Sequence, residues 1–333
     1  MRLPALLLSD LHLTANPADE YRWSIFKWVL ETIALEDIQT VCILGDLTDA
    51  KDYHPAALTN RLVQSLVSIS WLGVRVIVLQ GNHDYLKRGE AYFRFLSELP
   101  NITYVAEPWT DDSEGPLCIF LPHTKTPAKD WEGWDFSHFD YAFMHQTVGG
   151  AVASNGQRME DEGVPVPKGP KVFSGDIHVP QAVRGVEYVG SPYHVHFGDR
   201  FKPRCVLIDR RNRLDDLHFR TISRFATTIS KTSELKALAL KPGDQVKITV
   251  QLPEADVGAW AGVRREVIEA VAATGAELHG LKLAISRQDR RSAARQGDRS
   301  APRVLSDPDA ILQFVEKYEL GPDALELGLE LLR

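Results

Sequence analysis

Five short motifs of Asp, Asn and His residues each follow an apolar run at the point where a strand should end. In chain order they are DLH at residues 10–12, GDLTD at 45–49, GNHD at 81–84, His145 after YAFM, and GDIH at 175–178. Oxygen and imidazole ligands that converge from several strand ends suit hydrolases with paired metals, because two divalent ions need about seven protein ligands and one shared carboxylate. The motif order therefore predicts a binuclear metal site.

The runs that precede these motifs predict an α/β fold. Residues 3–9, 40–44, 74–79, 117–121 and 141–144 are almost continuously apolar, as in strands that are covered on both faces. Between them, Trp23, Phe26, Leu30 and Ile33 recur at helical spacing, and Pro55 opens a second helix that we expect to reach about residue 72. We expect a sheet layered between helices, with the motifs gathered at one edge.

With 333 residues, the chain is long enough for more than one domain. Residues 1–220 carry all five motifs and include a stretch rich in Gly and Pro at 149–170, which we interpret as a lid or a binding loop. The pattern changes near residue 221. A strand at 245–251, a helix at 260–273 and a strand at 281–285 predict a small β-α-β cap domain over residues 221–286.

The last part of the chain is predicted to be a linker followed by short helices. Residues 287–303 carry six arginines against two aspartates, hence a charge of +4, and form a basic flexible linker by composition. Residues 304–333 contain two short apolar helical patterns, broken at Gly321 and Pro322. Such helices cannot bury their own apolar faces, so we expect this helical segment to bind a partner. The alternative is that they dock back on their own chain.

The first two motifs supply three candidate metal ligands. Asp10 and His12 are two residues apart, so in an extended strand both side chains would point the same way and reach one cation. Asp46 follows Gly45, which would let the backbone approach the metals, and we predict that Asp46 bridges the two ions. Asp49 is interpreted as a residue that orients a ligand.

The third motif is the most specific single signal. Asn82 offers a neutral carbonyl ligand, and His83 beside it is predicted to act as a general acid toward the leaving oxygen. Asp84 would then hold the other ring nitrogen of His83. His145 completes the set, together with Asp176 and His178, which repeat the two-residue spacing. His123, His194 and His196 could line the site, whereas His54 and His138 are interpreted as structural or surface residues.

Composition limits the class of protein only weakly. The net charge of −7 argues against a basic nucleic-acid footprint, but two divalent ions would offset part of it. The apolar runs are too short to span a bilayer, and the chain enters its first strand without room for a cleavable signal. We therefore expect a cytoplasmic protein. Its three cysteines, Cys42, Cys118 and Cys205, lie in apolar runs and are expected to be buried thiols.

The motif series resembles that of the calcineurin-like metallophosphoesterase superfamily, D-x-H, G-D-x-x-D, G-N-H-D/E, H and G-H-x-H. The stretch GDIHVPQ at residues 175–181, followed by VGSP at 189–192 and FGD at 197–199, is similar to SbcD-type DNA repair nucleases. This resemblance implies a mixed β-sandwich flanked by helices, the metallophosphoesterase fold, with a small α+β cap and a C-terminal helical segment. It also implies a homodimer, DNA as substrate, and an SbcC-type ATPase that binds the C-terminal helices.

Asp176 departs from the family pattern, because it stands where the family has the first His of G-H-x-H. Aspartate can still ligate a divalent ion, and it makes the site harder and more negative, which favours Mn²⁺, with Mg²⁺ as the second possibility. Alternatively, the change weakens the second metal and leaves a poor enzyme with a structural role.

The residues and the resemblance together predict a metal-dependent nuclease, an exonuclease or an endonuclease, in DNA repair or recombination. One ion would be held by Asp10, His12, Asp46 and His178, and the other by Asp46, Asn82, His145 and Asp176. Hydrolysis would follow a two-metal mechanism with His83 as the acid. Two alternatives stay open at this point. They are a stand-alone phosphodiesterase or phosphatase of small substrates, and a weakly active scaffold for an ATPase.

Overall fold

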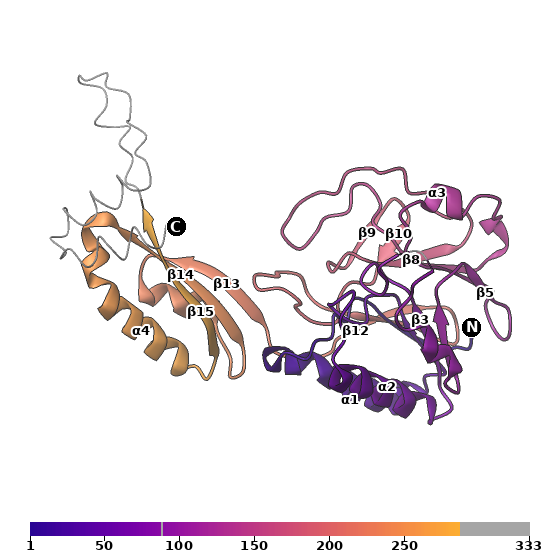
Figure 1. Ribbon diagram of the computed structural model, residues 1–333, viewed down its shortest axis with the longest axis horizontal. Coiled ribbons are helices and arrows are strands. Elements are labelled where there is room, and N and C mark those ends of the chain that lie inside the picture. Colours follow the sequence, from indigo (N-terminus) through magenta and orange to yellow (C-terminus); the bar gives the residue numbers. More distant parts are fainter. Residues whose placement is uncertain (88, 287–333) are drawn as a thin grey trace, which may run out of the picture. The chain divides into compact units, whose positions relative to one another are not determined.

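The computed structural model describes residues 1–87 and 89–286 (Figure 1). Residues 1–285 form one compact unit. The predicted linker 287–303 and the predicted helical segment 304–333 lie outside the described residues.

The first sheet has six strands in the order β12-β11-β1-β2-β3-β4. Their bounds are β1 (Ala5–Leu8), β2 (Thr40–Ile43), β3 (Arg75–Leu79), β4 (Ile102–Val105), β11 (Cys205–Ile208) and β12 (Leu214–Leu217). Strands β1 to β4 are parallel, and β11 runs antiparallel to both β1 and β12. Parallel neighbours need crossover connections. These contain η1 (Pro17–Asp19) and α1 (Glu20–Glu36), then α2 (Ala56–Ser70), then η2 (Arg94–Glu98).

The second sheet also has six strands, in the order β5-β6-β7-β8-β10-β9. Their bounds are β5 (Trp109–Asp111), β6 (Cys118–Leu121), β7 (Tyr141–His145), β8 (Lys171–Gly175), β9 (Gln181–Val183) and β10 (Val186–Tyr188). Strands β6, β7, β8 and β10 are parallel, and the two edge strands are antiparallel to their neighbours. Between β6 and β7 lie the short helices α3 (Pro127–Asp130) and η3 (Phe136–His138).

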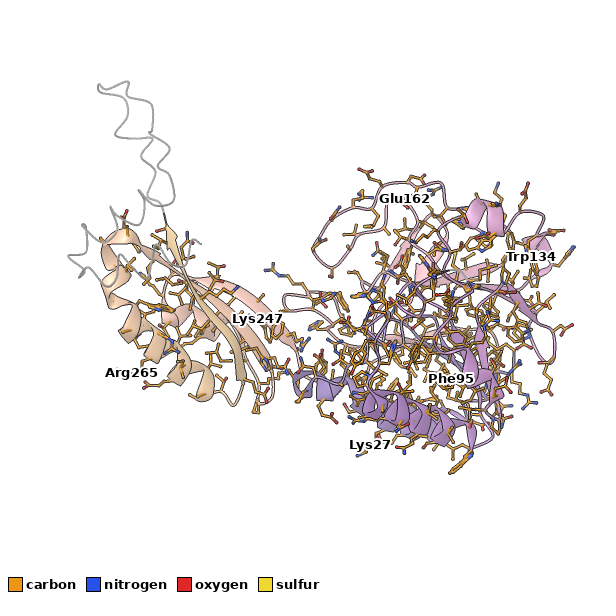
Figure 2. All side chains as sticks on the ribbon, in the orientation of Figure 1. Lys27, Phe95, Trp134, Glu162, Lys247 and Arg265 are labelled. Atoms are coloured by element: carbon orange, nitrogen blue, oxygen red, sulfur yellow. The ribbon has the colours of Figure 1, made fainter. Side chains whose placement is uncertain are left out.

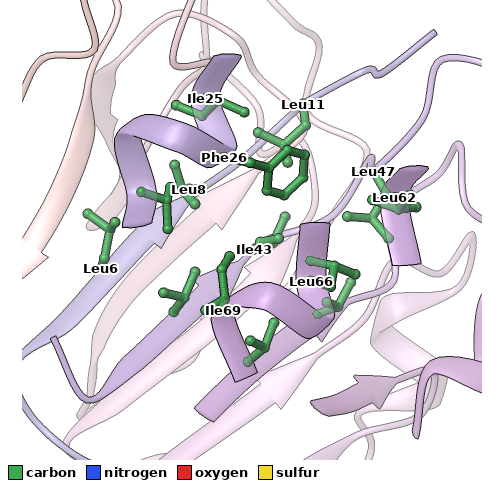
Figure 3. Packing of buried hydrophobic residues seen from close by; sticks show 14 of the residues in the cluster. Leu6, Leu8, Leu11, Ile25, Phe26, Ile43, Leu47, Leu62, Leu66 and Ile69 are labelled. Carbon is green, nitrogen blue, oxygen red and sulfur yellow. The ribbon is translucent and has the colours of Figure 1, made fainter. Parts of the chain in front are cut away.

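Alternate residues of β1 face different layers, which explains why the whole strand is apolar. Leu6 and Leu8 pack with α1 and α2 residues such as Ile25 and Leu66 (Figure 3). Leu7 belongs instead to the core between the two sheets, with Phe143 and Phe173. A third cluster covers the other face of the second sheet. The predicted mixed β-sandwich flanked by helices is therefore confirmed.

The cap residues form a three-stranded sheet with its own core. Its strands are β13 (Arg224–Ile229), β14 (Gln245–Pro253) and β15 (Glu277–Ser286), and its helices are η4 (Thr232–Leu238), η5 (Glu254–Ala259) and α4 (Trp260–Ala272). Val246, Ile248 and Val250 alternate inward from β14 against α4 residues such as Val267. The sequence prediction missed β13, which pairs parallel with β14.

The boundary predicted at residue 220 stays a prediction. Hydrogen bonds cross this boundary within the compact unit, because Arg224 donates to the Val195 carbonyl and to the Asp19 carboxylate.

All three cysteines are buried free thiols, as the sequence predicted. Among the described residues, none of the helices combines the length and the apolar character that crossing a bilayer requires.

Candidate metal centre

The five motifs meet because each follows a strand at the same edge of its sheet. In the first sheet, the motifs at 10–12, 45–49 and 81–84 follow the parallel neighbours β1, β2 and β3. In the second sheet, His145 is the last residue of β7, and the motif at 175–178 begins at the end of β8. The carboxyl ends of parallel strands point the same way, so the two sheets deliver their polar side chains to one place.

The backbone turns sharply at four of these residues. Asp10, His12, Asp46 and Asp176 have φ values of 54°, 43°, 55° and 79°, in the left-handed region that side chains other than glycine rarely adopt. Asp10 and His12 therefore do not point the same way from an extended strand, as we predicted, because β1 ends at Leu8. The two side chains converge through left-handed turns.

One half of the cluster is built from Asp10, His12 and His178, whose ligand atoms lie within 4.8 Å of one another. Nε2 of His12 is 3.0 Å from Nε2 of His178, and 3.5 Å from Oδ2 of Asp46. Two neighbouring ligands on an octahedral ion with bonds of ~2.1 Å lie about 3 Å apart. The facing imidazole nitrogens therefore suit a shared cation.

The other half centres on His145. Its Nε2 lies 3.5 Å from Oδ1 of Asp46, 3.3 Å from Oδ1 of Asn82 and 3.8 Å from Oδ1 of Asp176. Asp46 therefore turns one carboxylate oxygen toward His12 and the other toward His145. This placement is the one that a carboxylate shared between two ions requires.

Burial disfavours the charged forms of the carboxylates and imidazoles in this cluster. It raises the pKa of Asp10 to about 7 and raises the pKa of Asp46 as well. It lowers the pKa of His12 to about 4 and that of His178 to about 3. Neutral imidazoles are able to bind metals, and buried carboxylates need a cation to stabilise their charge. The donor set thus fits divalent ions.

Asp10 should couple metal binding to pH. Because its pKa is about 7, a proton occupies this carboxylate increasingly below pH 7, and an ion must displace it. His12 and His178 stay neutral down to about pH 4 and add no competition above it. We expect the apparent dissociation constant for Mn²⁺ to rise about fivefold between pH 7 and 6 through the proton on Asp10, and to approach tenfold per pH unit only at lower pH. Calorimetric titrations at several pH values, in two buffers of different ionisation enthalpy, measure this directly. An affinity that stays constant from pH 7.5 to 6 would contradict the role of Asp10.

Neighbouring groups orient the cluster from outside. Ser9 Oγ donates to Asp10 Oδ2 at 2.6 Å, and Nδ1 of His145 donates to the Leu44 carbonyl at 2.6 Å, which leaves Nε2 of His145 free to face the cluster. Asp49 Oδ1 is 3.4 Å from Nδ1 of His12, and this interaction lowers the pKa of Asp49 to about 2. The sequence analysis did not identify Ser9.

Asp84 does not hold the His83 ring, so that expectation is wrong. Its carboxylate accepts backbone N–H groups from Asp46, Leu47 and Gly81, at 2.9, 3.1 and 2.8 Å. Nδ1 of His83 instead donates to the backbone carbonyl of Asp49 at 2.6 Å. Asp84 thus ties the loop after β2 to the loop after β3. The His83 ring lies beside that of His12, with the ring centroids 4.9 Å apart, and its Nδ1 is the nitrogen that is already bonded.

Two glycines leave room for ligand side chains. A Cβ at Gly45, where φ is +94°, would lie 2.1 Å from Nδ1 of His145, and a Cβ at Gly81 would lie 2.2 Å from Oδ1 of Asp46. No side chain fits at either position without displacing a candidate ligand. Gly45 therefore makes space for His145, a more specific reason than the metal approach that we predicted.

Thr147 holds the unusual Asp176. Its hydroxyl donates a short hydrogen bond to Oδ2 of Asp176, and this leaves Oδ1 directed at His145. The backbone N–H of Asp176 donates to Oδ1 of Asp10 at 3.1 Å. Asp176 is thus held by two hydrogen bonds. Thr147 carries no motif signal, and the sequence analysis missed it.

Replacing Thr147 with valine should weaken binding at the Asp176 half of the cluster. Valine keeps the shape of threonine but cannot donate to Oδ2, and loss of such an orienting partner costs about tenfold to a hundredfold in metal affinity. Thr147→Ser keeps the hydroxyl and is the matched control. Calorimetry with Mn²⁺ should give two ions for wild type and the serine variant, and a weakened second ion for the valine variant. Equal affinities in the valine and serine variants would remove Thr147 from the site.

Further residues surround the cluster. The His123 ring lies beside that of His145, with centroids 6.1 Å apart, and the His196 ring stacks on His178 at 5.3 Å. Both were expected as possible lining residues, and both lie at the site. His138 is exposed and pairs with Asp135 at 3.0 Å, away from the cluster. A cavity of about 610 Å³ opens beside Asn82 and Asp176.

The loop expected to be a lid or a binding loop borders this cavity. Its residues Glu160 and Glu162 line one wall, and Glu162 is labelled in Figure 2. Val148, Ala151 and Val164 anchor the loop on the second sheet, where all three are buried. The loop is therefore part of the wall of the site.

Comparison with known proteins points to one family. The family model described as calcineurin-like phosphoesterase matches residues 3–180, a range that contains all five motifs. Exonuclease subunit 1 of Enterobacteria phage T4 is 24% identical over 215 residues, which cover 60% of this chain and 62% of that protein. The chain thus matches less than two thirds of that relative's length. A nuclease named MPE from Pseudomonas putida is 17% identical in structural alignment, with a TM-score of 0.32 and coverage of 64% of this chain and 87% of that one. Yfce, a phosphoesterase from E. coli, is 15% identical, with a TM-score of 0.32 and coverage of 66% and 100%.

Proposed function

Because the chain belongs to the calcineurin-like phosphoesterase family, we propose that this metal-dependent phosphoesterase is a DNA nuclease subunit that acts in end processing, repair or recombination. The observation that carries the chemistry is the bridging position of Asp46, whose two oxygens lie 3.5 Å from His12 and 3.5 Å from His145. The choice of DNA is supported by the SbcD-type stretch at residues 175–199 and by the phage relative, which is named an exonuclease subunit.

The proposed ligand sets are those expected from the sequence. One ion would be held by Asp10, His12, Asp46 and His178, and the other by Asp46, Asn82, His145 and Asp176. Three carboxylates and one amide supply hard oxygen ligands, which favour Mn²⁺ as the bound ion, with Mg²⁺ as the second possibility. When bound, two such ions polarise a phosphodiester and make a nucleophile available from water at neutral pH.

The chain's own residues then orient the substrate and move one proton. Nδ1 of His83 is held by the Asp49 carbonyl, so Nε2 is the atom that can protonate the departing sugar oxygen. Asp84 supports this placement, because its carboxylate accepts backbone N–H groups from Asp46 in the loop after β2 and from Gly81 in the loop after β3. Asp49 keeps the His12 ring turned toward the cluster.

Hydrolysis of two substrates in parallel tests the proposal. A labelled linear duplex and bis(p-nitrophenyl) phosphate are each incubated with Mn²⁺, Mg²⁺ or a chelator. We expect Mn²⁺-dependent cleavage of both. Cleavage of the small ester alone would favour the small-substrate phosphodiesterase, and no turnover with any ion would favour the scaffold.

We also propose that residues 304–333 bind an SbcC-type ATPase and that the nuclease works as a homodimer in the cytoplasm. The support for the partner is the resemblance and the apolar pattern of this segment. Deletion of residues 304–333 should abolish co-purification with such an ATPase and leave hydrolysis of the small ester unchanged. Retained association would place the partner surface elsewhere, and sedimentation of the full chain tests the dimer.

A further inference from the structure

Two cavities adjoin on the Asn82 side of the metal cluster. The inner cavity, of about 610 Å³, is lined by Asn82, Thr147 and Asp176 toward the cluster. The outer cavity, of about 700 Å³, extends away from it to Arg94, Pro108 and Trp131. The two share a wall formed by Tyr85, Leu86, His123, Thr124 and Lys125. A ligand that leaves the cluster past this wall therefore enters a second space that is large enough for a nucleoside.

The charges on the two cavities favour one path for a polyanion. Glu160 and Glu162 line the loop side of the inner cavity and repel phosphate. Two exposed lysines line the same cavity, Lys51 and, on the shared wall, Lys125, which forms no ion pair within the described residues. The outer cavity is lined by Lys87 and Arg94 as well as by Glu107 and Asp130, and Arg94 pairs with Glu107 at 3.9 Å, so Lys125 is the cation that both cavities share. A strand that leaves the metals should thus pass Lys125.

The outer cavity also offers apolar surface. Leu86 is 55% exposed although it is a large aliphatic residue, and it borders both cavities. Pro108 and the edge of the buried Trp131 extend this surface. Tyr85 donates its hydroxyl to Nδ1 of His123, or accepts from it, at 2.9 Å, and this bond fixes the shared wall. A base can cover Leu86 without losing a polar contact.

We propose that the outer cavity is a nucleotide subsite, in which Lys125 binds the phosphate next to the scissile one and Leu86 contacts the adjoining base. The inference rests on the proposed nuclease function and deepens it, because it assigns the substrate as an extended strand. A small phosphate ester would fill the inner cavity alone and would leave the outer cavity empty.

Strand binding measured by fluorescence anisotropy tests the phosphate contact. The probe is a labelled twelve-residue thymidine strand with phosphorothioate linkages, in Mn²⁺. Lys125→Gln should weaken binding about tenfold and reduce the slope of log affinity against log salt by about 0.7, the value for one phosphate on a single strand. Lys129→Gln is the matched control, because Lys129 is an exposed neighbour in α3 that lines neither cavity.

A set of strands with one uncharged methylphosphonate linkage each locates the contact. In wild type, the methylphosphonate at one position should reduce strand affinity more than at the others. This extra loss of affinity should disappear in Lys125→Gln. Likewise, a single abasic position should weaken binding to wild type at least about fivefold and should have no effect in Leu86→Asn. Leu72→Asn is the control, since Leu72 is 57% exposed and lies outside both cavities.

The outcomes separate this subsite from the nuclease proposal. The subsite would be overturned, even if DNA is cleaved, by either of two results. One is an equal loss of strand affinity in Lys125→Gln and Lys129→Gln, and the other is a loss of affinity that does not depend on the position of the methylphosphonate. Strand binding with the expected Lys125 and Leu86 signatures, but without DNA hydrolysis, would support the subsite and overturn the nuclease.

Discussion

Replacing Asp46 with asparagine is expected to abolish binding of both ions and to lower phosphodiester hydrolysis by at least about a thousandfold. The carboxylate faces both halves of the cluster, at 3.5 Å from His12 and 3.5 Å from His145. Asparagine preserves the shape and can still accept the His83 backbone N–H, which Oδ1 accepts at 2.9 Å, so the loop should keep its place. Only the charge and one ligand oxygen are lost.

Metal content by mass spectrometry and turnover of bis(p-nitrophenyl) phosphate measure the effect of Asp46→Asn together. The control is Asp52→Asn, an exposed aspartate a few residues further along the same loop, which should keep two ions and full activity. If Asp46→Asn retained two ions per chain, Asp46 would not be the bridge. The loss of only one ion would assign it to a single metal.

Replacing His83 with alanine should lower DNA hydrolysis by about 10²–10⁴-fold while both ions stay bound. The reason is that His83 donates Nδ1–H to the Asp49 carbonyl and keeps Nε2 for the leaving oxygen. A general acid matters most for a poor leaving group. The loss should therefore be much smaller for p-nitrophenyl esters, whose leaving group departs without a proton, than for DNA.

Two results would contradict this role of His83. Its ligand atom lies within 4.8 Å of those of His12 and Asp46, so loss of an ion in His83→Ala would make it a metal ligand. An equal loss for both substrates would assign it to binding rather than to proton transfer. His138→Ala is the control, because His138 is exposed and pairs only with Asp135 among the described residues.

Much of the fold followed from the pattern of apolar residues. Each of the predicted strand runs corresponds to a strand, from β1 (Ala5–Leu8) to β7 (Tyr141–His145), because strands buried on both faces are apolar throughout. β13 escaped prediction because it is not an apolar run: between its buried ends, Arg224 and Ile229, the residues are half-buried or exposed, and two of them are threonines. The helix predicted from Pro55 begins at Ala56, with Pro55 at the N-cap.

The choice of chemistry also followed from the sequence, because Asp, Asn and His at the ends of parallel strands gather at the carboxyl edges of their sheets. The way in which they meet did not. Asp10 and His12 turn inward through positive φ values, which no local pattern announced. Asp84 was assigned to the wrong partner, because the three backbone N–H groups it accepts belong to two loops that only the sheet brings together.

The sequence by itself determined the layered α/β fold and the position of the motif residues at strand ends, since apolar periodicity and residue type act locally along the chain. Only the tertiary structure decided which oxygen of Asp46 faces which histidine, that Thr147 holds Asp176, and that Lys125 separates two cavities. These are contacts between segments far apart in the chain, and their geometry depends on how the two sheets pack.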